Sequence, residues 1–176
     1  SALVGIAVAE GKIRSNEEPI SDYIDVEPGS AYDGVAIADV LRMSSGARWD
    51  EDYSNLESDA IRLARATRLP NGSLDHFVAT MSRDLEPGSL CRYNSADTQA
   101  LGLLVIKATG ENLADYMHRK LVEPLGFEYP AYWILDGRAR ELAFAGVNMT
   151  ARDFARLGEL YRPDGLWNGE QLVPEG

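Results

Sequence analysis

One stretch of the chain is apolar on every side of a helix, and a polar elbow precedes it. Most positions from residue 96 to residue 108 are apolar, and residues 100–106 carry no polar side chain; a helix that is apolar all round is a buried one. Ser95 is predicted to cap the start of this helix, and Gly110 to end it in the left-handed conformation. Asp97 falls in the first turn, where the helix dipole favours negative charge. The pattern predicts a central helix entered through residues 93–94.

Short amphipathic segments alternate with turns along the rest of the chain, which predicts further helices and little strand. Three capping residues stand at expected helix starts, namely Asp33, Asn112 and Thr150. The predicted helices cover residues 2–10, 35–43, 58–66, 74–81 and 113–122, with a last helix that begins at Thr150.

The C-terminal part is predicted to hold one helix, a short strand and several turns. The helix after Thr150 is expected to direct four side chains inward, those of Phe154, Leu157, Leu160 and Tyr161. The aromatic segment 129–136 is expected to contain a short strand. A glycine preceded by Asn or Asp predicts turns at 70–72, 164–165 and 168–169.

Composition places the chain among globular domains and excludes some partners. A chain of 176 residues is one domain of ordinary size or a large piece of a bigger one, and with 45% apolar residues it can bury a core. The formal net charge of −11 argues against nucleic acid and anionic membranes as partners. No apolar run is long enough to span a membrane, and no basic leader marks a signal peptide. Cys91 is the single cysteine, so an internal disulfide is excluded and the cellular compartment is left open.

Metal and cofactor chemistry has no support in the sequence. His76 and His118 lie on separate segments, without the spacing of a zinc site. The acidic loop 49–55 lacks the calcium-loop pattern, which favours a solvated loop. No glycine-rich phosphate loop is present. Residues 44–46, Ser-Ser-Gly, are interpreted as the end of a helix rather than as a nucleophile.

Tyr93 is the residue whose chemistry stands out. A phenol at a helix N-terminus lies near partial positive charge, which favours its anion and suits a group that moves protons. The ordinary alternative is a helix cap with a packed tyrosine beside it, and the local pattern alone favours that alternative.

Taken in order, several segments resemble the serine β-lactamase and penicillin-binding-protein superfamily. The resemblance is strongest to the class C-like esterases, D-alanyl peptidases and 6-aminohexanoate-dimer hydrolases. The Tyr-Asn-Ser form of residues 93–95 and the Ala-Tyr-Trp-Ile-Leu-Asp of residues 131–136 resemble the last of these groups. The segments that carry the resemblance are 5–13, 37–46, 93–95, 101–102, 109–110, 123–126, 149–158 and 165–169.

The resemblance implies a hydrolase of amide or ester bonds that needs no cofactor. In that family a serine attacks a carbonyl and forms an acyl-enzyme, and a lysine lowers the pKa of the tyrosine that moves the proton. Tyr93 matches that tyrosine, and Ser95 stands where the family has asparagine. Tyr93 and Ser95 are thus the catalytic candidates. The candidates for substrate binding are Asn94, Tyr53, Tyr132 and Trp133; Trp49 is a further pocket-wall candidate, although core packing explains these aromatic residues equally well.

The resemblance also implies that residues 1–176 are the mainly α lobe of a single α+β domain of the β-lactamase and transpeptidase type. The family's Ser-x-x-Lys pair is expected upstream of Ser1, because Val4 and not lysine stands three residues after Ser1. A Lys-Thr-Gly-type strand, and most of the antiparallel sheet, are expected from flanking sequence. The chain alone is predicted to be inactive. The alternative is a helical binding module or an inactive fragment; substrate and oligomeric state are left open.

Overall fold

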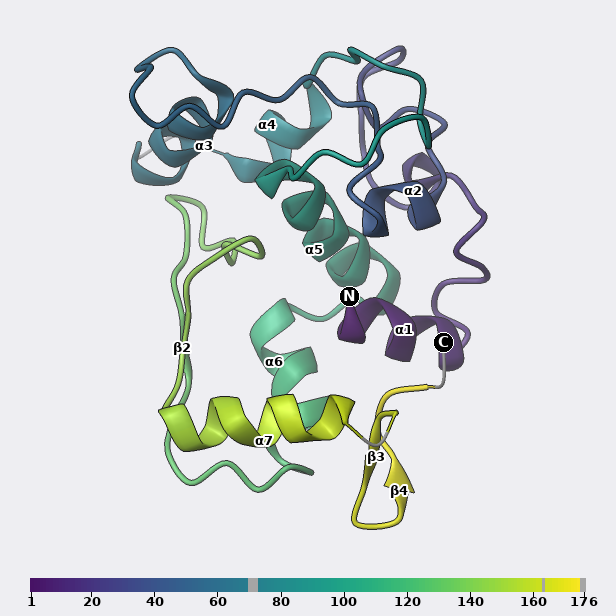
Figure 1. Cartoon of the computed structure of the whole chain (residues 1–176), viewed down its shortest axis with the longest axis vertical. Coiled ribbons are helices and arrows are strands. Elements are labelled where there is room, and N and C mark those ends of the chain that lie inside the picture. The colour runs from purple at the N-terminus through teal and green to yellow at the C-terminus, as the bar shows by residue number, and fades with distance from the viewer. Residues whose placement is uncertain (70–72, 163, 175–176) are drawn as a thin grey trace.

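A computed structural model describes residues 1–69, 73–162 and 164–174, and the turn predicted at 70–72 lies outside them. The described part is mostly helical (Figure 1). Its helical elements are α1 (Ala2–Ala9), the 3₁₀ turn η1 (Ile20–Asp22), α2 (Ile37–Leu41), α3 (Asp59–Arg68), α4 (Leu74–Ala79), α5 (Ser95–Thr109), α6 (Leu113–Met117), the π-helical turn η2 (His118–Val122) and α7 (Ala151–Tyr161).

The central helix α5 is the element around which the others pack. Helices α1, α2 and α4 contact it from different sides, and α6 follows it in the chain (Figure 1). Most of its residues from Ser95 to Val105 are buried, which confirms the prediction from its all-round apolar pattern. Gly110 ends the helix at φ 75°, in the left-handed conformation that was predicted.

The start of α5 differs from the prediction by one residue. Asn94, not Ser95, is the N-cap: its Oδ1 accepts the backbone N–H of Ala96 at 2.8 Å, and Ser95 is the first helical residue. Asparagine caps helices as well as serine does, and Asn94 has the extended backbone that a cap requires. Asp97 lies in the first turn of α5, as predicted, and its side chain is fully buried.

Helix α2 is shorter than predicted and is not capped by Asp33. Its N-cap is Ala36, which offers no side-chain hydrogen bond. Asp33 instead accepts the backbone N–H of Gly29 at 2.7 Å, within the preceding loop. The carboxylate of Asp33 is therefore bound by a backbone N–H of the local turn and is not available to cap α2.

Two short antiparallel pairs of strands complete the fold. Strand β1 (Tyr132–Trp133) pairs with β2 (Val147–Asn148), with Tyr132 opposite Asn148, and confirms the strand predicted within 129–136. Strand β3 (Leu166–Trp167) pairs with β4 (Glu170–Gln171). The long hairpin 132–148 lies along α5, where Gln99 donates to the carbonyl of Glu141 at 3.1 Å and accepts the N–H of Ala143 at 2.8 Å.

Helices α6 and α7 begin as the sequence predicts. The side chain of Asn112 accepts the N–H of Asp115 at 2.7 Å, and that of Thr150 accepts the N–H of Asp153 at 3.2 Å. The inward face predicted for α7 is partly wrong. Leu160 is fully buried and Leu157 is half-buried, but Phe154 and Tyr161 are 48% and 52% exposed, because α7 lies at an edge of the described structure (Figure 1).

The C-terminal segment returns to the first helix. A β-carbon built on Gly5 of α1 would lie 3.6 Å from Cγ of Pro174. Within the described ranges, no helix is both long and apolar enough to cross a membrane.

Candidate functional site

The elbow before α5 is held by the segment 43–47, which runs beside it. The backbone N–H of Arg92 donates to the carbonyl of Met43, and that of Gly88 to the carbonyl of Ser44, both at 2.8 Å. Tyr93 follows directly, and 64% of it is exposed. The backbone that leads to Tyr93 is thus fixed, while its phenol is open to solvent.

Gly46 allows this close approach. Its carbonyl accepts the N–H groups of Asp84 and Leu85 at 2.8 and 3.0 Å. Its φ is +77°, and a β-carbon there would lie 2.1 Å from the carbonyl oxygen of Leu85. Only glycine fits both the backbone angle and the space.

A buried carboxyl group, that of Asp97, lies under the elbow. Its Oδ1 accepts three hydrogen bonds: from the Tyr32 hydroxyl at 2.9 Å, from Ser45 Oγ at 2.7 Å and from Asn94 Nδ2 at 3.2 Å. Its Oδ2 is buried and has no hydrogen-bond partner among the described residues. One oxygen therefore joins three separate segments of the chain. We call Tyr32, Ser45, Asn94 and Asp97 the elbow cluster.

Burial changes the acid–base behaviour of the elbow cluster. Loss of solvation raises the pKa of Asp97 to about 6, although the hydrogen bonds from Ser45 and Tyr32 oppose this shift. Burial, together with the neighbouring Asp97, raises the pKa of the Tyr32 phenol well above its usual value.

The three residues of the Tyr-Asn-Ser motif have different environments. Tyr93 is exposed, whereas Asn94 is 2% and Ser95 9% exposed. Both polar atoms of the Asn94 side chain make hydrogen bonds inside the protein, to Ala96 and Asp97. Tyr93 is the motif residue that presents its functional group to solvent.

Tyr53, a predicted substrate-binding residue, lies in the acidic loop and is 68% exposed. Its hydroxyl donates to the carboxylate of Glu51, which also accepts the indole N–H of Trp49. The hydrogen bond to Glu51 and the loss of solvation raise the pKa of Tyr53. Trp49 is only 6% exposed, so it packs in the core.

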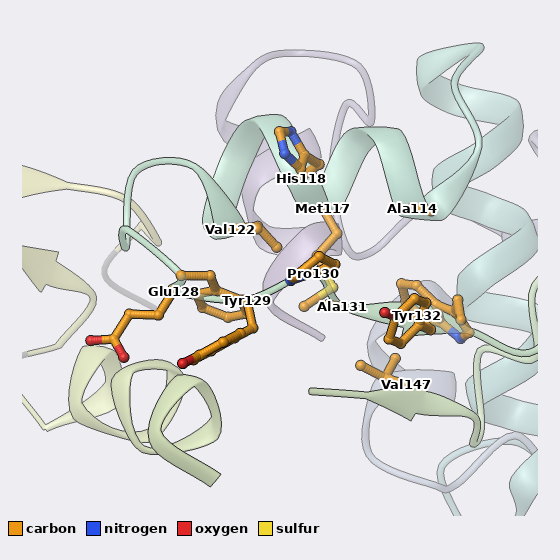
Figure 2. Close-up of a pocket in the computed structure, with 12 residues that line it drawn as sticks. Ala114, Met117, His118, Val122, Glu128, Tyr129, Pro130, Ala131, Tyr132 and Val147 are labelled. Carbon is orange, nitrogen blue, oxygen red and sulfur yellow. The ribbon is translucent and has the colours of Figure 1, made fainter. Parts of the chain in front are cut away.

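The other two predicted substrate-binding residues, Tyr132 and Trp133, line a cavity of about 460 Å³ (Figure 2). The structure does not bring them together with Tyr93, because the described residues that line this cavity include neither Tyr93 nor Tyr53. The indole N–H of Trp133 donates to the carbonyl of Leu142 at 2.8 Å, which closes the hairpin. The remaining lining residues come mainly from α6, η2 and the segment 127–131.

The acidic loop uses its carboxylates on its own backbone. Asp50 accepts the N–H of Asp52 at 3.0 Å, and Asp52 accepts that of Ser54 at 2.8 Å. Over the ranges that the structure describes, no group of three or more His, Cys, Asp or Glu residues is arranged to hold a metal ion.

Sequence reasoning missed the elbow cluster as a unit. One signal was available, because Asp97 is an ionisable residue at the start of a helix that is otherwise almost wholly apolar. No local pattern indicates its partners Tyr32 and Ser45, which lie 65 and 52 positions away. The Ser-Ser-Gly segment also does more than end a helix, since Ser45 supports the elbow.

Comparison with known proteins gives relatives of one kind. The chain is 29% identical, over 180 residues, to the 6-aminohexanoate-dimer hydrolase of Paenarthrobacter ureafaciens, covering 99% of this chain and 45% of that protein. A solved structure named "Putative 6-aminohexanoate-dimer hydrolase from Bacillus anthracis" matches with a TM-score of 0.88 and 26% identity, over 99% of this chain and 47% of that one. The octameric penicillin-binding protein homologue of Pyrococcus abyssi shares the fold, with a TM-score of 0.63 and 18% identity, over 99% and 44% of the two chains.

The chain thus spans about half the length of the relatives it matches. The family model described as Beta-lactamase matches residues 1–176, that is, the chain from end to end. This chain belongs to the Beta-lactamase family, as the segments around the elbow and the central helix indicate.

Proposed function

We propose that the complete protein is a serine hydrolase of amide or ester bonds, with Tyr93 as the residue that moves protons. The observation that carries the proposal is the position of Tyr93: an exposed phenol on a backbone held on both sides. The hydrolase names of the relatives support the same class of reaction.

The nucleophile of this reaction is proposed to lie outside residues 1–176, as a Ser-x-x-Lys pair, with a Lys-Thr-Gly-type strand also supplied from outside. The length of the relatives, about twice that of this chain, supports this arrangement. We therefore expect no turnover from the 176-residue chain by itself.

The proposed reaction has two steps. The serine oxygen forms a bond to the substrate carbonyl carbon, and the bond to the amine or alcohol leaving group breaks. Tyr93, as its anion, takes the serine proton and delivers it to the leaving group. Water then forms a bond to the acyl carbon and the ester bond to the serine oxygen breaks, while Tyr93 passes a proton of the water to that oxygen; the acid leaves and the serine hydroxyl is restored. A free phenol with a pKa of about 10 is a poor base at neutral pH, so a lysine ammonium beside Tyr93 is required to lower its pKa.

The remaining candidates keep supporting roles in this proposal. Ser95, next to the exposed Tyr93, is proposed as the second catalytic residue of the motif. Asn94 is proposed as a substrate contact through its main chain, because both polar atoms of its side chain are bonded inside the protein. Tyr53 is proposed as a wall of the same site. Tyr132 and Trp133 are proposed to contact the part of a small-molecule amide or ester that lies farthest from Tyr93. This role requires a substrate long enough to extend from Tyr93 to their cavity.

The test is acylation of the complete protein by an activated ester or a penicillin, followed by intact mass. We expect one acyl adduct on the unsubstituted protein and none on Tyr93→Phe, because phenylalanine keeps the ring and removes the proton carrier. Circular dichroism and thermal unfolding should be unchanged, since the Tyr93 side chain is largely exposed.

Tyr161→Phe is the matched control, because it removes a half-exposed phenol from α7, outside the elbow. It should form the adduct at the normal rate. A Tyr93→Phe protein that is acylated normally would overturn the role of Tyr93. A complete protein that forms no adduct with any probe would favour the alternative, a helical binding module or an inactive member of the family.

A further inference from the structure

The elbow cluster suggests how the orientation of the Tyr93 side chain is fixed. We propose that Asp97 is a positioning residue: its buried carboxylate holds Asn94 and the segment 43–47 together, and thereby fixes the direction of the Tyr93 side chain in the elbow before α5. This inference rests on the proposed function, because it assigns Asp97 to the reaction of Tyr93.

Both chain neighbours of Tyr93 are tied to parts of the protein that Asp97 holds. On one side, Asn94 donates directly to Asp97 Oδ1 at 3.2 Å. On the other side, Arg92 donates to the carbonyl of Met43 at 2.8 Å. Met43 stands two residues before Ser45, which donates to the same Oδ1 at 2.7 Å. One carboxylate oxygen therefore restrains the backbone on both sides of Tyr93.

Fold stability alone does not account for a carboxylate at this position. The helix is already capped by Asn94 through Ala96. Burying a carboxylate costs free energy, and Oδ2 of Asp97 is buried without a hydrogen-bond partner among the described residues, in line with the raised pKa of this group. A neutral side chain of the same shape would stabilise the fold more. Costly buried charge beneath an exposed reactive group is typical of functional sites.

The charge itself strengthens the restraint. A carboxylate accepts stronger and shorter hydrogen bonds than a neutral acid or amide. The groups that face Asp97 are the Tyr32 phenol from the loop before α2, the Ser45 hydroxyl from the segment 43–47 and the Asn94 amide from its own element. Tyr32 is the one titratable group among these three, and it stays protonated at neutral pH because its pKa is raised. Protonation of Asp97 below about pH 6 would therefore loosen the elbow.

The test is Asp97→Asn in the complete protein, with acylation rates and thermal unfolding measured from about pH 4 to pH 8. Asparagine keeps an acceptor at the Oδ1 position and removes the charge. We expect the acylation rate constant at neutral pH to fall by about tenfold, with less than about twofold change in KM, because orientation and not binding is impaired. The part of the rate profile that follows Asp97 near pH 6 should disappear.

At neutral pH, Asp97→Asn should lower the acylation rate without lowering the melting temperature. The pKa of Asp97 is raised on folding, from 3.8 to about 6. Its favourable contribution to stability is therefore full below the ordinary carboxyl range and is lost as the pH rises through about 6. At neutral pH, the melting temperature of Asp97→Asn should thus equal or exceed that of the unsubstituted protein. At about pH 4, where Asp97 is protonated, this advantage of the variant should disappear. A residue with a purely structural role would lose rate and stability together.

Asp153→Asn is the matched control, because Asp153 is also fully buried, at the start of α7. Burial raises its pKa, but hydrogen bonds from the Thr150 hydroxyl, the backbone N–H of Glu128 and the Arg156 guanidinium outweigh this and lower it overall. Asp153→Asn should therefore lower the melting temperature at neutral pH and leave the acylation rate unchanged.

The outcomes separate this inference from the proposed function. Normal acylation of Asp97→Asn, with Tyr93→Phe inactive, would overturn the positioning role alone. A rate loss in Asp97→Asn together with a lower melting temperature would also overturn it. Normal acylation of Tyr93→Phe would overturn the proposed function itself.

Discussion

At the scale of single residues, Gly46 is the position where one added methyl group should do most damage to the site. Its carbonyl holds Asp84 and Leu85, and its neighbour Ser45 belongs to the elbow cluster. A side chain at Gly46 would therefore separate the two segments that support Tyr93.

We predict that Gly46→Ala destabilises the protein by about 3 kcal/mol or more. Alanine at positive φ costs about 1 kcal/mol, and a β-carbon 2.1 Å from the carbonyl oxygen of Leu85 forces the backbone apart. Urea denaturation measures the change. Gly29→Ala is the control, because Gly29 has φ +76° with no atom within 4 Å of the added carbon. Equal losses in both variants would show that the close contact contributes nothing.

At the scale of elements, the hairpin 132–148 packs on α5 through Gly102. A β-carbon on Gly102 would lie 2.4 Å from that of Ala143 and 3.2 Å from Leu113 Cδ1. The absence of a side chain therefore lets the helix and the hairpin approach, and Gln99 can reach Glu141 and Ala143 one helical turn before.

We predict opposite effects for two glycines in the middle of helices. Gly102→Ala should destabilise by about 1–3 kcal/mol, because overpacking exceeds the gain in helix propensity. Gly158→Ala in α7 should stabilise by about 0.5–1 kcal/mol, because its added carbon meets no atom within 4 Å. Denaturant unfolding of both variants checks this. A stabilised Gly102→Ala would contradict the prediction, because it would mean that the hairpin can move away from α5 without loss of stability.

The elements that could be predicted from sequence are those with local causes. The caps at Asn112 and Thr150 and the glycine after α5 depend on neighbours within a few residues, so the pattern identified them. Asp33 failed as a cap because a nearby backbone N–H competed for its carboxylate. Which side chains α7 buries depends on distant segments.

In the candidate site too, the residues with a local signal could be predicted and those that depend on distant segments could not. Tyr93 was found from its place in the motif before the central helix, and whether it moves protons stays a prediction. The partners of Asp97 come from segments more than 50 positions away, and no periodicity encodes such a distance. The separation of Tyr132 and Trp133 from Tyr93 likewise follows from how the hairpin lies on α5.

At the scale of the whole molecule, the cavity of about 460 Å³ is lined mainly by apolar side chains (Figure 2), and Tyr93 is not among its lining residues. Aromatic side chains form much of its wall, among them Phe127, Tyr129, Tyr132 and Trp133. Concave apolar surface of this kind binds amphipathic dyes.

We predict that the 176-residue chain binds anilinonaphthalene sulfonate at this cavity. Tyr132→Glu should weaken dye binding by about 1 kcal/mol, roughly fivefold, because it removes apolar contact and adds charge at the wall. Tyr53→Glu is the control, since Tyr53 and Tyr132 are both 68% exposed and Tyr53 lies outside the cavity. Fluorescence titration measures both affinities. Equal weakening by the two substitutions would place the dye elsewhere.

Pro174 lies close to α1, since a β-carbon on Gly5 would be 3.6 Å from Cγ of the proline ring. The two segments are far apart in the sequence, and closing so long a loop costs chain entropy that a short-range contact does not cost. Contacts of this kind slow folding, so we expect this one to form after the local helices have formed.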